Sequence, residues 1–347
     1  MLSESQKLFR GVGTEIKPGM EIEEILERGK LNWKVEVQEF QYDTPLGLKN
    51  SKDYSTFVAY RSDTGDLLTT IGQGWKPFQN HDLVKNFLEF CDRSNLQPDW
   101  IGFLPRKRGA RSHVAPNMLF ISAKIPEEEG GVFHIDTDDV INSRVVFYNH
   151  HFYSFGCGCY LLTCREICTN GMTLTSKETS RMLSHIQSHV GDAEKVRESL
   201  DKLKRSLQVY NDNLTNLADI PLEPEEALAI LIRDFGYMGK PLNEQPKIVQ
   251  TCLMLFLGEL DDELKDKKGI NLGSSTLAAY RTAYGLLQSV TAYRTHMVGT
   301  GSATTHITSM LNGDSAKVVN KSYRSLLKLS RSLETSTTIN VQNVRII

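Results

Sequence analysis

The sequence lacks a long apolar run, a strong charge of either sign and a recognisable catalytic signature. None of its apolar stretches approaches the roughly 20 residues that a helix needs to cross a bilayer. The N-terminal stretch MLSESQKLFRGVGTEIKPG also has no apolar core of the kind found in secretory signals. We therefore expect a cytoplasmic protein that has no membrane among its partners.

The charge balance excludes a protein that attracts polyanions with its whole surface. Lysine and arginine number 40 against 42 aspartates and glutamates, which gives a formal net charge of -2. Any nucleic-acid site must then be a local basic patch. The length of 347 residues allows two domains or one large one, and the 40% hydrophobic content is ordinary for a globular chain.

Common catalytic and cofactor motifs are also missing. The sequence has no G-x-x-x-x-G-K-[ST] phosphate loop, no G-x-S-x-G nucleophile elbow and no H-E-x-x-H metal motif. It has no G-x-G-x-x-G in the strand-to-helix setting that dinucleotide-binding folds use. We therefore predict no catalytic residue and no cofactor, and the sequence favours a non-enzymatic protein.

The first half of the chain is rich in aromatic and β-branched residues interrupted by Gly and Asp turns. Residues 54–60 and 66–71 predict a hairpin around Gly65, and a helix is expected over 81–92 with Asn80 as its cap. Further strands are expected at 118–124, 132–135, 144–150 and 153–167. Regular strand–helix alternation is absent, so we predict an α+β fold whose N-terminal half, 1–176, is a mainly antiparallel sheet domain.

The second half, 177–347, has the pattern of successive helices and predicts a helical domain. Pro221 and Gly236 bound one of these helices. The expected helices cover 176–190, 193–218, 224–235, 245–265, 274–297 and 314–333, with a flexible joint at 299–304.

The helix expected over 193–218 carries an apolar seam with alternating steps of four and three residues. The seam consists of Val196, Leu200, Leu203, Leu207, Tyr210, Leu214 and Leu217. This heptad pattern is typical of an amphipathic helix packed on its own domain, and also of a helical hairpin or an oligomer contact. Under the second interpretation the protein is a homo-oligomer.

The densest group of reactive side chains lies between Tyr148 and Thr173. Its members are His150, His151, Cys157, Cys159, Cys164 and Cys168. Side chains alternate between the faces of a strand, so Cys157 and Cys159 share one face and Cys164 lies on the other. One zinc ion could not collect all four thiols without a break in the strand. Buried thiols are therefore favoured over zinc or redox chemistry, we predict no metal site, and His150 and His151 point to opposite faces.

Two further segments offer chemistry as well as a plain structural interpretation. Residues 168–172 predict a strand-to-helix turn, whose N–H groups could hold an anion or serve the fold alone. The acidic run of Asp136, Asp138 and Asp139 could bind a divalent cation together with His150, or form a solvated turn.

Two local basic patches stand out against the near-neutral total. The first is a loop with Arg106, Lys107, Arg108 and Arg111. The second lies on the last expected helix and consists of Lys317, Lys321, Arg324, Lys328 and Arg331. Its steps of four and three residues place all five cations along one stripe, with no acid between the first and the last. Both patches favour contact with phosphates, and the alternative is a solvated face that aids solubility.

Three segments resemble the phage/plasmid-like protein family, a domain of unknown function (nine-three-two). They are YRSDTGDLLTTIGQGWKPFQN, REICTNGMTL and TLAAYRTAYGLLQSVTAY. The second resembles an R-x-x-C-x-N-G/T turn on Arg165, Cys168, Asn170 and Gly171. The third resembles an N-A-V-T-x-Y helix on Ser289, Val290, Thr291 and Tyr293.

The resemblance covers about residues 20 to 330 and departs from the family at one place. Members often carry S-H-D-G-S where this chain has N-H-H-F-Y at 149–153, so only His150 matches. The resemblance implies a mobile-element protein made in a bacterial host. The antiparallel sheet followed by helices is more remotely similar to Rad52-like phage single-strand annealing proteins, which oligomerise and hold single strands in a basic groove.

Three functions remain open at this level. The leading hypothesis is a phage or plasmid protein that binds single-stranded DNA through both basic patches, in annealing, recombination or replication. The second is a non-enzymatic interaction factor that acts on host or assembly partners. The third is a metal-dependent nuclease or hydrolase that uses His150 and the 136–139 turn.

Overall fold

The computed structural model describes residues 3–105, 118–151, 157–167, 170–174, 193–268, 270–298 and 302–342. Within these residues, seven strands form an antiparallel sheet in the order β1-β7-β8-β10-β11-β12, with β9 paired to the start of β10. The strands are β1 (Thr14–Glu15), β7 (Gln97–Leu104), β8 (Met118–Lys124), β9 (Val132–Asp136), β10 (Asp139–His150), β11 (Cys157–Arg165) and β12 (Asn170–Leu174).

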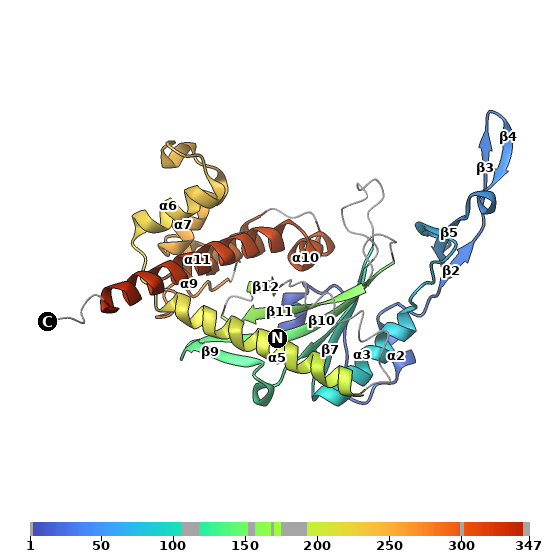
Figure 1. The fold of residues 1–347 in the computed structure, drawn as a ribbon, viewed down its shortest axis with the longest axis horizontal. Helices are drawn as coiled ribbons and strands as arrows, with labels where there is room; N and C mark the ends of the chain where they lie inside the picture. The colour runs from blue at the N-terminus through green and yellow to red at the C-terminus, as the bar shows by residue number, and fades with distance from the viewer. Residues whose placement is uncertain are drawn as a thin grey trace.

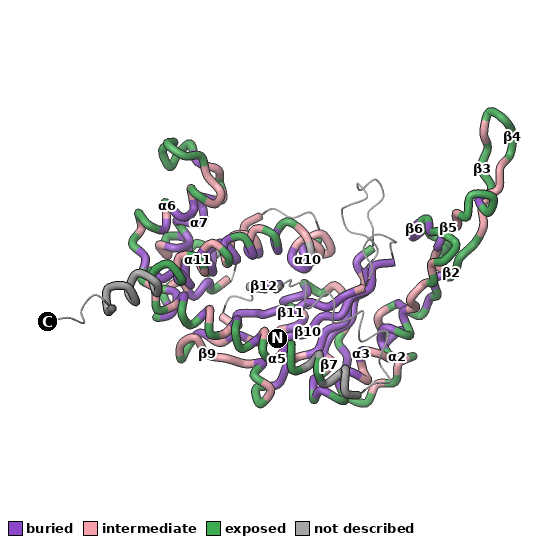
Figure 2. Tube along the Cα trace, in the orientation of Figure 1, coloured by how far each residue is buried: buried purple, intermediate pink, exposed green. Residues whose placement is uncertain are grey.

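Both faces of this sheet are covered, which explains why β8 is apolar and buried along almost its whole length. One face packs against α2 (Ile22–Arg28), α3 (Asn80–Ser94) and the first part of α5 (Ala193–Ala218). The opposite face packs against α1 (Glu4–Leu8) and α10 (Ala303–Asn312). The buried centre of the sheet is visible in Figure 2.

A second core lies among the helices of the C-terminal half. Its centre is α9 (Ala283–Ala292), all of whose residues are buried. Around it pack the second part of α5 and three further helices. These are α6 (Pro224–Phe235), α7 (Lys247–Phe256) and α11 (Asp314–Gln342), while α8 (Asp261–Lys268) contributes to a smaller cluster beside them. Because α5 packs against both the sheet and this helical core, it joins the two halves (Figure 1).

A long β-arm stands away from the body of the molecule (Figure 1). Its base is the sheet β2-β5-β6 and its tip is the hairpin β3-β4. The strands are β2 (Val35–Gln38), β3 (Gln41–Thr44), β4 (Gly47–Asn50), β5 (Thr56–Arg61) and β6 (Leu67–Gly72). The tip leaves Leu46 89% exposed and Leu48 61% exposed.

The structure confirms the predicted α+β class, with antiparallel sheets in the first half and helices in the second. The strand predicted at 118–124 and the helix predicted over 193–218 have the observed bounds of β8 and α5. Gly65, around which the hairpin was predicted, takes a positive φ of 68° in the β5–β6 turn.

Several local predictions are wrong for identifiable reasons. Asn80 does not cap α3: Gln79 takes that position, and the buried Asn80 side chain donates to the carbonyls of Leu31 and Trp33. The turn predicted at 168–172 is a strand from Asn170 onward, because Asn170–Leu174 pairs with β11 as strand β12, while residues 168–169 lie outside the described residues. The helix expected over 245–265 is interrupted near Gly258, whose φ of 74° a helix cannot accommodate.

The start of the helix expected over 274–297 is irregular, and its end is a π-helical turn, η4 (Tyr293–Met297). Residues from 303 belong to α10 rather than to a flexible joint. The helix expected over 176–190 lies outside the described residues.

The apolar seam of α5 is buried within its own chain. Leu203 and Leu207 pack into the core under the sheet, and Tyr210, Leu214 and Leu217 pack into the helical core. All five are at most 4% exposed. The side chains of Val196 and Leu200 lie outside the described residues. The described part of the seam therefore follows the intramolecular interpretation and offers no surface to a second copy.

Candidate nucleic-acid interface

The predicted basic stripe lies on α11, and the apolar residues of that helix decide which way it faces. Val319 and Leu326 are 4% and 0% exposed and belong to the helical core. The cations at steps of three and four residues lie on the opposite side of α11 and are exposed.

Four of the five stripe cations line a groove of about 780 Å³ between α11 and the end of α6. These four are Lys317, Lys321, Arg324 and Lys328. The facing wall carries Arg233 and Asp234, and Asn320 and Ser325 of α11 also line the groove. The groove therefore combines five cationic side chains with one carboxylate.

Two carboxylates engage part of the positive charge of the groove: Asp234 contacts Arg233, and Asp314 lies 3.9 Å from Lys317. Ser325 Oγ donates to Asp234 Oδ1 at 3.0 Å, and Arg233 Nε lies 3.1 Å from the same oxygen. Lys321 Nζ donates to the backbone carbonyl of Asp234 and lies 5.1 Å from the ring centre of Phe235. Arg324 and Lys328 form no ion pair with any residue that the structure describes. They are available to an anionic ligand.

The remaining predicted cations are Arg331 and the four of the first basic patch. Arg331 is exposed on α11 and is not among the residues that line the groove. The first basic patch, with Arg106, Lys107, Arg108 and Arg111, falls outside the described residues.

The described cysteines are separated as the strand geometry predicts. Cys159 packs into the core beneath one face of the sheet, and Cys164 packs into the core on the other face. Burial raises the pKa of the Cys159 thiol above its ordinary range, so the thiol stays protonated. No group of three potential metal ligands occurs in the described part of the chain, and Cys168 lies outside it.

His150 and His151 are both buried, at 5% and 2% exposure. His150 packs edge-on against Tyr148, whereas His151 packs against Trp33 and lies 2.8 Å from Asn80 Oδ1. Burial, reinforced by the neighbouring His151, lowers the pKa of His150 to about 3. Burial, reinforced by Arg61, lowers the pKa of His151 to about 4. Both imidazoles are therefore neutral at neutral pH.

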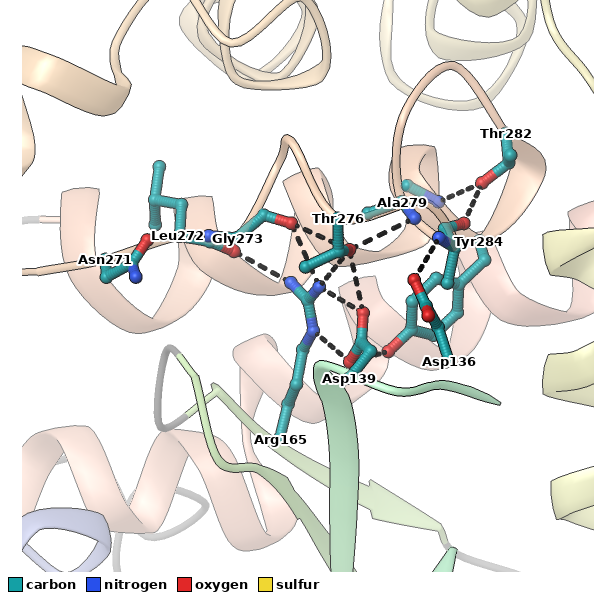
Figure 3. A network of polar contacts seen from close by, with 12 residues as sticks. Asp136, Asp139, Arg165, Asn271, Leu272, Gly273, Thr276, Ala279, Thr282 and Tyr284 are labelled. Atoms are coloured by element: carbon teal, nitrogen blue, oxygen red, sulfur yellow. Dashed lines mark hydrogen bonds and ion pairs between the residues drawn. The ribbon is translucent and has the colours of Figure 1, made fainter. Parts of the chain in front are cut away.

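Arg165 is the first residue of the REICTNGMTL segment that resembles the family. It forms a buried polar network between the sheet and the segment before α9 (Figure 3). Its guanidinium binds both carboxylate oxygens of Asp139, with Nε to Oδ1 at 2.6 Å. It also donates to the carbonyls of Leu272 and Gly273, at 2.7 and 3.0 Å. Tyr284 and Thr276 donate to the same carboxylate, each at 3.1 Å. Arg165 and Asp139 are at most 2% exposed, so the network ties the two halves together and is closed to solvent.

The structure separates the residues on which the third hypothesis, a metal-dependent nuclease or hydrolase, depends. Asp139 begins β10 and His150 ends it. Eleven residues of strand place their Cα atoms about 36 Å apart. Since the carboxylate of Asp139 is occupied by Arg165, Thr276 and Tyr284, the structure does not bring His150 and the 136–139 turn into one site.

Sequence reasoning found the α11 wall of the groove and missed the α6 wall. Arg233 and Asp234 lie more than eighty residues before the stripe, and a single arginine–aspartate pair at a helix end carries no distinguishing pattern. Trp75 and Phe78, two aromatic residues between β6 and α3, pack against the core under the sheet and do not line the groove.

Comparison with known proteins gives one match. The family model described as a domain of unknown function, DUF932, matches residues 67–323. No curated protein and no solved structure matches the chain. None of the described helices is long and apolar enough to span a membrane.

Proposed function

This chain belongs to the DUF932 family, and we propose that it binds single-stranded nucleic acid in the groove between α6 and α11. The observation that carries the proposal is the line of Lys317, Lys321, Arg324 and Lys328 along one wall of a groove in a protein whose net charge is only -2. The chain has no excess of cations, yet four of them lie along one wall of this groove. Such local clustering is the feature expected of a phosphate-binding patch.

The dimensions of the groove suit a nucleic-acid backbone. At 1.5 Å per helical residue, the cations from Lys317 to Lys328 span about 16 Å. A strand whose bases stack as in B-form DNA carries one charge per roughly 3.4 Å and presents about five phosphates over that length. Arg233 on the opposite wall supplies the fifth cation of the groove.

One strand fits these features better than a duplex. The groove offers a single line of cations between two helices, whereas a duplex presents two backbones. Proteins that bind single strands combine such a basic groove with exposed aromatic side chains. Tyr237, just beyond the end of α6, is 61% exposed and could stack on a base. The carboxylate of Asp234 limits affinity for bare phosphate and favours ligands that also donate hydrogen bonds.

We further propose that this binding serves strand annealing or recombination for a phage or plasmid in the bacterial cytoplasm. The support is the resemblance of the three sequence segments to the phage/plasmid-like family, together with an antiparallel sheet followed by helices, the arrangement we expect of Rad52-like annealing proteins. Self-association belongs to the same proposal, and it must use a surface other than the described part of the α5 seam, which is buried. Measuring the size of the protein with and without single-stranded DNA tests this part.

The salt dependence of binding to a labelled oligothymidine tests the groove. Five phosphate contacts to a single strand predict a slope of about -3.5 in log K against log salt concentration, because each contact contributes about -0.7. Affinity should then fall roughly a hundredfold between 50 and 200 mM salt. The triple variant Lys321→Glu, Arg324→Glu and Lys328→Glu should lose most of the binding at every salt concentration.

A matched triple variant controls for the change in net charge. Lys85→Glu, Lys202→Glu and Arg205→Glu replace three exposed cations on α3 and α5, away from the groove. This variant should bind like the wild type. Affinity that does not respond to salt, or a groove variant that binds as well as its control, would refute the proposal.

One observation favours the alternative of a protein-interaction factor. The β-arm projects from the body and exposes Leu46, Leu48 and Tyr54 by 60% or more. Exposed apolar side chains that cluster on one element commonly mark contacts with another protein. Shortening the arm tests this alternative independently of nucleic-acid binding in the groove.

A further inference from the structure

A second cavity, of about 470 Å³, lies where the N-terminal helix meets the C-terminal half of the chain. Gln6, Lys7 and Arg10 line it from α1 and the turn that follows. Thr295 and His296 line it from the π-helical turn η4, and His306 lines it from α10. Its volume falls in the range of small-molecule sites, about 300–1,000 Å³. It shares no lining residue with the groove between α6 and α11.

The cavity is cationic and no carboxylate offsets it. None of the described lining residues is acidic. Glu4, the acid of α1, is directed elsewhere: its carboxylate lies 2.9 Å from Arg144 and 3.4 Å from Lys124. Neither Lys7 nor Arg10 forms an ion pair with a described residue. Their charge is therefore available to a bound anion.

Two features fix the position of Arg10: its own backbone conformation and a hydrogen bond from its side chain to the backbone of η4. Its own φ is 48°, a left-handed conformation that is costly for a residue with a side chain. Its guanidinium donates to the carbonyl of Thr295 in η4. Isolated π-helical turns and strained residues are both concentrated at functional sites. The single donated bond leaves the other N–H groups of Arg10 for a ligand.

One ring nitrogen of His306 is among the buried polar atoms that the described part of the fold leaves unsatisfied. His306 is 2% exposed, and its Nδ1 has no hydrogen-bond partner among the described residues. Burial, followed by the charges of Arg10, His296 and Arg294, lowers the pKa of His306 to about 4. A buried, unpartnered ring nitrogen among cations costs stability unless an anionic or hydrogen-bonding ligand supplies the missing partner.

We propose that this cavity binds a small organic phosphate, with Arg10, Lys7 and His306 around the phosphate group. Apolar side chains complete the wall, namely Leu8, Ile270 and Met310. Such a lining holds the uncharged part of an organic ligand and gives bare phosphate only part of the contact. A free nucleoside monophosphate and the 5′-phosphate end of a strand present the same chemistry.

The nuclear magnetic resonance signal of His306 reports occupancy directly. The full chain is labelled at histidine Cε1, and the His306→Gln variant assigns the signal. Adenosine monophosphate should shift the His306 signal and raise the pKa of His306 by at least one unit, because a phosphate beside the ring favours the imidazolium. Inorganic phosphate should do the same at higher concentration, whereas adenosine should leave the signal unchanged.

Substitutions test the residues. Arg10→Gln should weaken binding of adenosine monophosphate at least tenfold, and Lys7→Gln, which changes an exposed residue, should weaken it without disturbing the fold. Lys85→Gln on α3 is the matched control and should bind normally. A 5′-phosphorylated dinucleotide distinguishes a free nucleoside monophosphate from the 5′-phosphate end of a strand as the source of the phosphate. Equal binding of adenosine and its monophosphate, or normal binding by both Lys7→Gln and Arg10→Gln, would overturn the proposal, and neither result bears on the groove.

Discussion

At the scale of single residues, two buried arginines join the sheet to segments that are distant from it in the sequence. Arg144 and Arg165 are the largest fully buried side chains of the described residues. Arg144 binds Glu4 at 2.9 Å and Asp99 at 3.2 Å, which attaches the N-terminal helix to the sheet. Arg165 attaches the sheet to the segment before α9. A buried ion pair contributes little net stability when intact, but it is costly to break.

Replacement of Asp139 should show this asymmetry. Asp139→Asn leaves Arg165 buried with its charge uncompensated, so the free energy of unfolding should fall by about 3–5 kcal/mol. Urea denaturation followed by circular dichroism measures the change. The pair of the partly buried Arg61 and the exposed Asp63 provides the control, since Asp63→Asn should cost about 1 kcal/mol or less. Equal losses in the two variants would mean that the buried network does not hold the halves together.

Individual residues were predictable where one periodicity decided their place. Cys159 and Cys164 lie on opposite faces because strand side chains alternate, whatever surrounds them. The role of Asn80 was not predictable, since its partners are the carbonyls of Leu31 and Trp33, almost fifty residues earlier. Burial of the Asn80 amide against those two acceptors outweighs the local preference of asparagine for the N-cap position.

At the scale of elements, α5 shows how one helix serves two cores. Its seam enters the core under the sheet at Leu203 and Leu207, and the helical core from Tyr210 onward. The heptad spacing that also suited an oligomer contact is thus satisfied within the chain. The spacing of apolar residues fixes which face of a helix is buried, and leaves open which partner covers it.

Two substitutions on α5 test this assignment. Leu214 is fully buried, and Leu214→Ala should lower the free energy of unfolding by about 2–5 kcal/mol. Val209 is 59% exposed on the same helix, and Val209→Ala should change stability by no more than about 0.5 kcal/mol. Sedimentation velocity should give the same size for both variants as for the wild type. A change of assembly state in Leu214→Ala at unchanged stability would contradict the intramolecular packing.

Elements were predicted best where packing and local preference agree. The run MLFISAK is apolar throughout, and β8 is buried on both faces. The strands β3 and β4 were missed because they are short, polar and exposed, and resemble loop sequence. The long helix expected over 245–265 was wrong because its apolar spacing continues past Gly258, where the backbone takes a positive φ.

At the scale of the whole molecule, both candidate sites are assembled from distant segments. The groove joins α6 to α11, and the cationic cavity joins the first described helix to η4 and α10. The sequence could predict the stripe on α11, because one helix contains it. It could not predict Arg233 opposite the stripe, or Arg10 beside His306, because tertiary packing alone brings those pairs together.

Shortening the β-arm tests whether the groove or the arm binds nucleic acid. Phe40 and Ser51 lie side by side, joined by hydrogen bonds of 2.9 Å in both directions. Replacing residues 41–50 by Asn-Gly should therefore close the arm as a tight hairpin. The removed side chains are mostly exposed, so stability should change by less than about 1 kcal/mol.

If the groove is the nucleic-acid interface, the shortened chain should bind oligothymidine with the same affinity and the same salt slope as the wild type. The groove is lined by α6 and α11, and the arm contributes none of its lining. Fluorescence anisotropy at several salt concentrations measures both quantities, and thermal unfolding confirms that the shortened chain is folded. A folded, shortened chain that no longer binds the oligonucleotide would transfer the function from the groove to the arm.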